Sequence, residues 1–127
     1  MAMFDTDVLI WVQRGSEKAA ALVEKTEERC ISVITLMELL QGALGKTQHR
    51  YVKEFLEKYD FRVLPLGENI GYRASIYIEE YALGHGLRVA DALIAATAVE
   101  HNEALLSSNK KHYQIITELN LTVFKPA

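Results

Sequence analysis

The feature of this sequence that most constrains its fold is the alternation of short β-prone apolar runs with longer segments of helical periodicity. The β-prone runs are Met3-Phe4, Cys30–Val33, Phe61–Pro65, Ala104–Ser107 and Leu121–Phe124. Between them, apolar residues recur at the spacing of helices that bury one face. Strands separated by helices pair in parallel, because each returning helix packs on the sheet. The pattern therefore predicts an α/β fold with three layers, α/β/α, around a central, mostly parallel five-stranded sheet.

The expected helices begin and end at recognisable signals. We predict helices over roughly 16–26, 35–45, 47–59, 68–83 and 90–99. Ser16 and Thr47 are suitable N-caps, and Gly45 is a suitable end for the helix that begins near Thr35. The last of these segments is apolar almost all the way round, which is typical of a buried helix.

Length and composition fit one globular domain over residues 1–127, since 50% of the residues are apolar and 24% are charged. The net charge of −3 gives no global sign of a polyanion-binding protein, although a local basic patch or a bound cation can still attract nucleic acid. Cys30 has no partner for an internal disulfide, and the N-terminus lacks the features of a signal peptide. No apolar run approaches the ~20 residues of a membrane helix, so we expect a cytoplasmic protein.

Acidic residues stand at several of the expected strand–helix junctions. Asp5 ends the first strand, Glu38 falls in the first turn expected after the second, and Asp91 opens the apolar helix that precedes the fourth. Ser107-Ser108-Asn109 ends the fourth strand. In such sheets ligands bind beyond the carboxyl ends of the strands, where the strand order reverses. We therefore expect these residues to face one crevice.

Each acid also has an ordinary structural role open to it. Asp5 or Thr6 can cap the helix that follows. Thr35 and Glu38 match a capping box, and Glu38 also lies opposite the apolar stripe, where it would simply be solvated. The dipole of the apolar helix alone can stabilise Asp91.

Taken together, four motifs resemble a known family. They are Phe4-Asp5-Thr6-Asp7-Val8-Leu9-Ile10, Ser32–Leu39, Asp91–Ala98 and Leu105–Tyr113. In this order and spacing they resemble the PIN domain, and most closely the VapC-type toxin ribonucleases of toxin–antitoxin pairs. The resemblance covers essentially the whole chain. It implies a metal-dependent endoribonuclease in which Asp5, Glu38 and Asp91 hold one or two Mg²⁺ or Mn²⁺ ions and a metal-activated water cleaves the RNA phosphodiester bond.

The chemistry of the residues agrees with that implication. Hard divalent cations prefer oxygen ligands, and three close carboxylates repel one another unless a cation lies between them. By the resemblance, Thr6 and Ser107 would hydrogen-bond the carboxylates or a bound water. The basic side chains at 88, 110 and 111 would contact phosphate; for each of Arg88, Lys110 and Lys111, an ordinary solvated face is the alternative.

The sequence departs from the family at two places. Asp7 stands where Asn is more usual, which adds a negative charge at the rim of the site. The family often has a fourth acid in the segment matched by 109–113, where this chain has Asn109 and His112 at the suitable positions. A single metal ion is therefore expected, with His112 available as a proton donor. Alternatively, Lys110–Tyr113 is a solvated turn with Tyr113 packed inward.

Three other functions remain open at this point. A haloacid dehalogenase-like phosphatase also begins with Asp-x-Asp after a strand, but the paired acids that it needs are not evident. A PIN-like protein that binds RNA without cutting it would not need all three acids. A receiver-like signalling domain would use one Asp as phosphoacceptor.

The resemblance also implies partners. Besides an RNA substrate it implies a cognate antitoxin, a homodimer formed through other helices, and no membrane. The antitoxin would meet the two helices between Thr35 and Tyr59, whose apolar residues include Leu40, Leu44, Tyr51 and Phe55. The alternative is that these side chains pack on the chain's own sheet.

Overall fold

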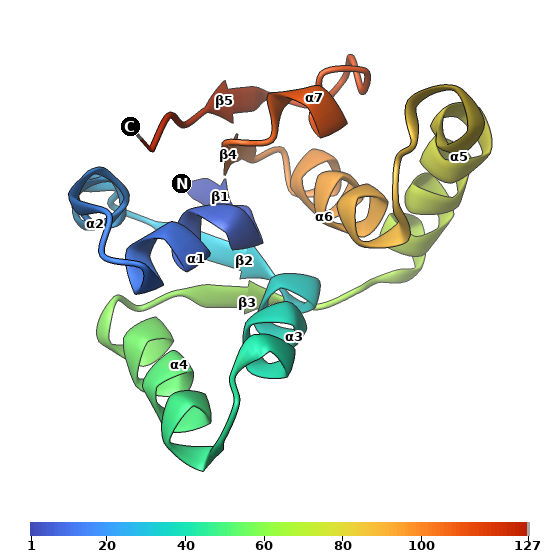
Figure 1. The fold of residues 1–127 in the computed structure, drawn as a ribbon. Helices are drawn as coiled ribbons and strands as arrows, with labels where there is room; N and C mark the ends of the chain where they lie inside the picture. Colours follow the sequence, from blue (N-terminus) through green and yellow to red (C-terminus); the bar gives the residue numbers. More distant parts are fainter. Residues whose placement is uncertain (127) are drawn as a thin grey trace.

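The computed structural model describes residues 1–126; Ala127, which the predicted domain includes, lies outside the described residues. The sheet has five strands: β1 (Ala2–Phe4), β2 (Arg29–Ser32), β3 (Arg62–Leu64), β4 (Ala104–Ser107) and β5 (Leu121–Val123). Every pairing is parallel, and the strand order is β3-β2-β1-β4-β5. The predicted parallel five-stranded sheet is confirmed (Figure 1).

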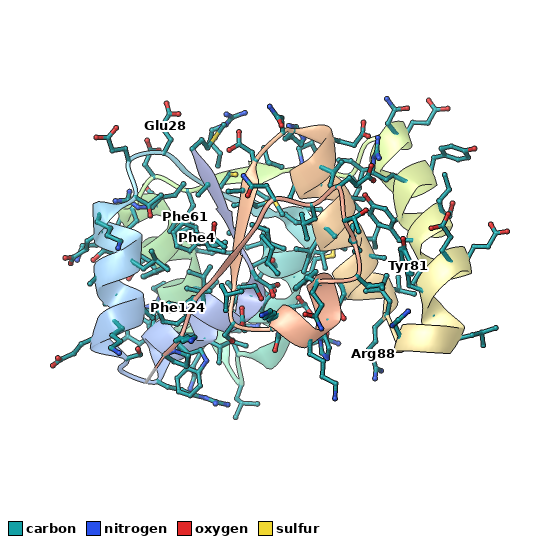
Figure 2. The ribbon with its side chains drawn as sticks, turned by 90° about the horizontal axis from the view of Figure 1, so that it is seen from above. Phe4, Glu28, Phe61, Tyr81, Arg88 and Phe124 are labelled. Carbon is teal, nitrogen blue, oxygen red and sulfur yellow. The ribbon has the colours of Figure 1, made fainter. Side chains whose placement is uncertain are left out.

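Helices cover both faces of this sheet, which confirms the three layers. They are α1 (Thr6–Gln13), α2 (Glu17–Lys25), α3 (Val33–Gly42), α4 (Lys46–Lys58), α5 (Glu68–His85), α6 (Val89–Glu100) and α7 (Lys110–Tyr113). Helices α1, α2 and α4 lie on one side, and α5 and α6 lie on the other (Figures 1 and 2). Among residues 1–126, no helix is long and apolar enough to span a bilayer.

Two hydrophobic clusters form the core, one on each face of the sheet. Adjacent strand residues alternate between them because successive side chains point to opposite faces. Met3 and Leu105 belong to the cluster under α5 and α6, whereas Phe4 and Leu106 belong to the cluster under α1, α2 and α4. Burial on both faces explains why these runs are continuously apolar.

The centre of the sheet is where the strand order reverses. The chain builds outward from β1 to β3 and then returns to place β4 on the other side of β1. Met3 is in register with Cys30 of β2 and Leu105 of β4. Asp5 and Ser107 therefore lie together beyond the carboxyl ends of β1 and β4, the place where α/β sheets of this kind bind ligands.

Two predicted helix starts are wrong. Helix α3 begins at Val33 and not near Thr35, because the Ser32 hydroxyl caps it by accepting from the backbone N–H of Ile34 at 3.0 Å. Glu38 therefore lies in the second turn, and the capping box expected for Thr35 and Glu38 does not form. Helix α3 ends at Gly42, and Gly45 is the N-cap of α4 in place of Thr47.

Candidate functional site at the β1–β4 edge

Asp5 is the most buried of the predicted site acids, with 3% of its surface exposed. It is the N-cap of α1, and its Oδ1 accepts from the backbone N–H of Thr6 at 2.9 Å. Its Oδ2 accepts from the hydroxyl of Ser107 at 2.7 Å. The cap role expected for Asp5 is thus present, but it uses only one of the two carboxylate oxygens. The other oxygen ties the end of β1 to the end of β4.

Glu38 is linked to Asp5 through Thr6. The Thr6 hydroxyl donates to Glu38 Oε1 at 2.6 Å, and it lies 3.0 Å from the hydroxyl of Thr35. Because a hydroxyl has one proton, Thr6 accepts from Thr35 while it donates to Glu38. Glu38 therefore turns toward the end of β1 and is not simply solvated on the polar face of α3.

Asp91 reaches the same region from the first turn of α6. Its Oδ2 lies 3.6 Å from Nδ1 of His112, and its Oδ1 lies 3.5 Å from the phenolic oxygen of Tyr113. Both partners come from α7, directly after the β4 end. The helix dipole is therefore not the only group that faces this carboxylate.

Asp7 fastens the loop after β4. Its Oδ2 accepts from the backbone N–H of Ser108 at 2.8 Å and also from the Ser108 hydroxyl. Its Oδ1 is buried and has no hydrogen-bond partner among residues 1–126. An unpartnered buried carboxylate oxygen is costly unless a cation or a water satisfies it. Asn109 takes part through its backbone, whose N–H donates to the Ser107 hydroxyl at 3.0 Å.

The electrostatics of the site are dominated by crowded negative charge. The pKa of Asp5 is raised from 3.8 to about 7, mainly by burial and also by the charges of Asp7 and Asp91, although hydrogen bonds from Ser107 and Thr6 lower it. Burial and the charges of Asp5 and Asp91 also raise the pKa of Tyr113 far above its usual range. A positive ion at this place would relieve both effects.

The basic residues predicted for phosphate contacts are exposed. Arg88 is the residue before α6, and Lys110 and Lys111 lie in α7 beside the acids in sequence. Among residues 1–126 none of the three has a carboxylate within ion-pair distance. They are therefore free to meet an anion.

The residues fit a divalent cation in donor chemistry and in charge. Their side chains offer carboxylate oxygens, which Mg²⁺ and Mn²⁺ prefer, and one such oxygen of Asp7 is buried without a partner. Within the described residues, however, no three acidic, histidine or cysteine side chains are already gathered as a ligand set. Repulsion between like charges explains why the carboxylates are not gathered around one point. Asp5 and Glu38 instead accept hydrogen bonds from the hydroxyls of Ser107 and Thr6.

The structure gives three residues roles that were not predicted for them. Thr35 and the side chain of Ser108 join the hydrogen-bond network, and the hydroxyl of Tyr113 faces Asp91 although its ring packs inward as expected. The position of Tyr113 directly after His112, together with its polar atom, was the available signal. Of the two residues at the expected fourth position, the side chain of His112 approaches Asp91.

Comparisons with known proteins agree on one family. The family model for the PIN domain matches residues 2–117. The chain is 30% identical to Ribonuclease VapC1 of Methanocaldococcus jannaschii, with 80% of this chain and 74% of that protein covered. It is 31% identical to Ribonuclease VapC of Rickettsia bellii, with 92% and 91% covered. A solved toxin–antitoxin complex from Klebsiella pneumoniae superposes with a TM-score of 0.79 at 30% identity, covering 100% and 98% of the two chains. The chain belongs to the PIN-domain family, and its relatives there are of the VapC type.

Proposed function

We propose that this protein is a metal-dependent endoribonuclease and the toxin of a toxin–antitoxin pair. The observations that carry the proposal are the hydrogen bond of Glu38 to Thr6, beside Asp5, and the charge repulsion between Asp5 and Asp91 at the reversal point of the sheet, in a chain whose relatives are VapC ribonucleases. We also propose a cytoplasmic location, where RNA substrates are available. Family membership removes the phosphatase and receiver-like alternatives, and it leaves a non-cleaving RNA-binding protein as the competitor.

In this proposal the three acids hold one Mg²⁺ or Mn²⁺ ion. When bound, the cation supplies Lewis acidity, both to activate a water nucleophile and to neutralise charge on the scissile phosphate. Ser107 and Thr6 keep Asp5 and Glu38 oriented through the hydrogen bonds described above. Asp5, with its pKa near 7, releases its proton as the cation binds.

The basic residues around the acids act on the RNA. Arg88, Lys110 and Lys111 contact the phosphates on either side of the cleaved bond, and each contact adds salt dependence to binding. His112 Nδ1 faces Asp91, which leaves Nε2 free to donate a proton to the leaving oxygen.

The test of this function uses isosteric changes. Asp5→Asn and Asp91→Asn should abolish Mg²⁺- or Mn²⁺-dependent cleavage of total RNA, with the circular dichroism spectrum unchanged. Glu24→Gln, an exposed carboxylate on α2, is the matched control and should keep full activity. Full activity in either site variant, or in excess chelator, contradicts the mechanism. Tight RNA binding without cleavage by the wild type favours the non-cleaving alternative.

The position of the fourth ligand has its own test. His112 lies near Asp91, whereas Asn109 contacts Ser107 through its backbone N–H. We therefore expect His112→Asp to tighten Mn²⁺ binding in a calorimetric titration and Asn109→Asp to change it little. If Asn109→Asp tightens Mn²⁺ binding and His112→Asp does not, α7 rotates when the metal binds.

The partner surface proposed for the antitoxin is the α3–α4 hairpin. Leu40 and Phe55 pack partly against the chain's own core, so for these two residues the alternative of packing within the domain is correct. Leu44 and Tyr51 remain 93% and 64% exposed. A hollow of about 610 Å³ lies beside this turn, lined by Ala43, Leu44, Gly45, Lys46, His49, Arg50 and Lys53. We propose that an antitoxin segment covers this surface, as an apolar groove accepts a helix.

Charged substitutions separate the proposed surfaces. Leu44→Asp and Tyr51→Asp should weaken antitoxin binding while the melting temperature stays unchanged. Leu83→Asp is the matched control, because Leu83 is fully exposed on α5, outside the hairpin. We also propose that the chain forms a homodimer through helices outside the hairpin, and sedimentation of Leu83→Asp tests whether α5 takes part. Equal loss of antitoxin binding in all three variants would show that the hairpin is not the site.

A further inference from the structure

We infer that Tyr113 is a positioning residue for Asp91, whose carboxylate accepts from the Tyr113 hydroxyl and is held in place by it. This inference deepens the proposed function, and it rests on that function only where metal binding is concerned.

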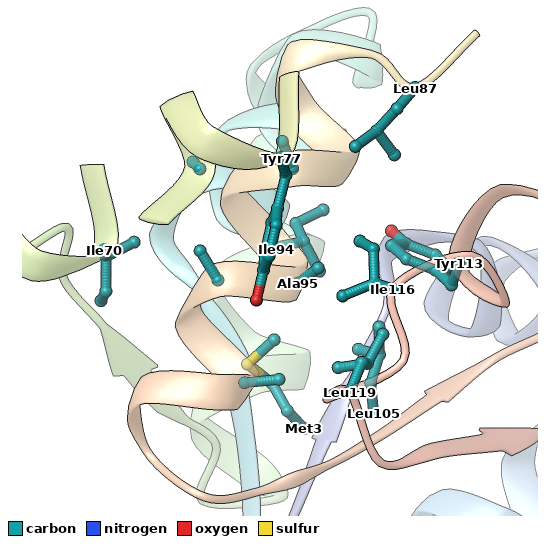
Figure 3. Close-up of a cluster of buried hydrophobic side chains, with 14 of the residues drawn as sticks. Met3, Ile70, Tyr77, Leu87, Ile94, Ala95, Leu105, Tyr113, Ile116 and Leu119 are labelled. Atoms are coloured by element: carbon teal, nitrogen blue, oxygen red, sulfur yellow. The ribbon is translucent and has the colours of Figure 1, made fainter. Parts of the chain in front are cut away.

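The ring of Tyr113 is part of the core. The residue is 0% exposed and belongs to the cluster between the sheet and helices α5 and α6. In the close-up the ring lies beside Ile116 with Leu87 above it (Figure 3). A phenylalanine ring would fill the same space, so packing alone does not account for the hydroxyl.

The hydroxyl has an acidic partner. Its oxygen lies 3.5 Å from Asp91 Oδ1, and burial together with the nearby charges of Asp5 and Asp91 raises its pKa. A phenol beside carboxylates stays protonated, so it faces Asp91 as a donor. A buried hydroxyl normally has such a partner, and here the partner is one of the three acids that are proposed to hold the cation.

The backbone around Tyr113 is firmly held. The Tyr113 carbonyl accepts from the N–H of Ile116 at 3.0 Å, and Ile116 itself is buried. Farther along, Glu118 accepts from Arg73 at 2.6 Å and from the hydroxyl of Tyr77. These contacts fix the loop that follows α7 to α5. The chain that carries the phenol is therefore held in place on its C-terminal side, as a positioning group requires.

Tyr77 offers a matched control for this inference. It belongs to the same hydrophobic cluster and is 5% exposed, but its hydroxyl donates to Glu118 instead of the site acids. Tyr113→Phe and Tyr77→Phe therefore make the same chemical change in the same core. Only the first removes a donor from Asp91.

The deciding experiment is a double-mutant cycle in chelator. Urea unfolding midpoints are measured for Tyr113→Phe, Asp91→Ala and the pair of changes. If the hydroxyl holds Asp91, the paired changes should lower the midpoint by less than the sum of the separate effects. The same cycle with Tyr77→Phe should be additive. Additive effects for Tyr113, or equal coupling for both tyrosines, would overturn the inference.

A Mn²⁺ titration of the folded proteins forms the second arm. Tyr113→Phe should bind Mn²⁺ roughly tenfold more weakly, as is usual when a group that orients ligands is lost, and Tyr77→Phe should bind it as the wild type does. Unchanged binding by Tyr113→Phe counts against a positioning role. If the wild type binds no Mn²⁺, the proposed function fails by itself, and the metal-free cycle still decides the role of Tyr113.

Discussion

Asp5→Asn should make the metal-free protein more stable at pH 8, although it removes a residue at the centre of the site. The folded protein raises the pKa of Asp5 from 3.8 to about 7. An acid with a raised pKa contributes most stability below pH 3.8 and loses it as the pH rises toward 7. At ~1.4 kcal/mol per pH unit, the ionised carboxylate costs the folded state about 4 kcal/mol at pH 8.

The substitution also has a cost. Asp5 accepts from Ser107 and from the backbone of Thr6 through its two oxygens, and an amide has only one oxygen. Losing one such hydrogen bond costs about 1–1.5 kcal/mol. The net gain is therefore about 2–3 kcal/mol at pH 8, roughly 8–10 °C in Tm. At pH 5 the two effects nearly cancel.

Urea unfolding in chelator at pH 5 and pH 8, followed by circular dichroism, measures this difference. Glu24→Gln on the exposed face of α2 should show no such pH dependence. Adding Mn²⁺ should then stabilise the wild type more than the variant, because binding to the folded state stabilises by mass action. The reasoning is refuted if Asp5→Asn is less stable than the wild type at pH 8. It is also refuted if the difference in the free energy of unfolding between variant and wild type is the same at pH 5 and pH 8.

Three further outcomes are expected. Arg73→Ala should lower the free energy of unfolding by about 1 kcal/mol in a thermal scan, because Arg73 is partly exposed and pairs with Glu100 at 2.5 Å and with Glu118; no change would mean that the pairs are solvated. Gly86→Ala should also cost about 1 kcal/mol by urea unfolding, since Gly86 has φ 67° while an added Cβ would meet no atom within 4 Å; a neutral result would show that the C-cap rearranges. Burial raises the pKa of Cys30 to about 11, so the native protein at pH 8 should resist iodoacetamide that labels it in urea, and rapid native labelling would contradict the buried position.

The elements and the acid-bearing edge could be predicted from the sequence because each rests on a local pattern. The runs around Met3, Cys30 and Leu105 are apolar on both faces, which a buried parallel strand requires. The strand order could not be read in this way. It depends on which helices return over which face, and no short motif encodes that choice.

Competition between neighbouring hydroxyls explains the errors at α3. Ser32 and Thr35 are both suitable caps, and the difference is that Thr35 is engaged by Thr6, 29 positions away in the sequence. The same long-range contact turns Glu38 toward the site. The role of the Tyr113 hydroxyl could not be predicted for a similar reason, because its partner Asp91 lies 22 positions earlier in the sequence.

The hydrogen bond between Asp5 and Ser107 joins residues that are 102 positions apart. On the ribosome, the chain must be extended by that length after Asp5 before the pair can form. At about 5–20 residues per second, the delay is about 5–20 s. Until β4 has been synthesised, β1 lacks one of its two neighbouring strands, and the edge that carries the acids is incomplete. The order of the strands therefore postpones assembly of this edge until most of the chain has been synthesised.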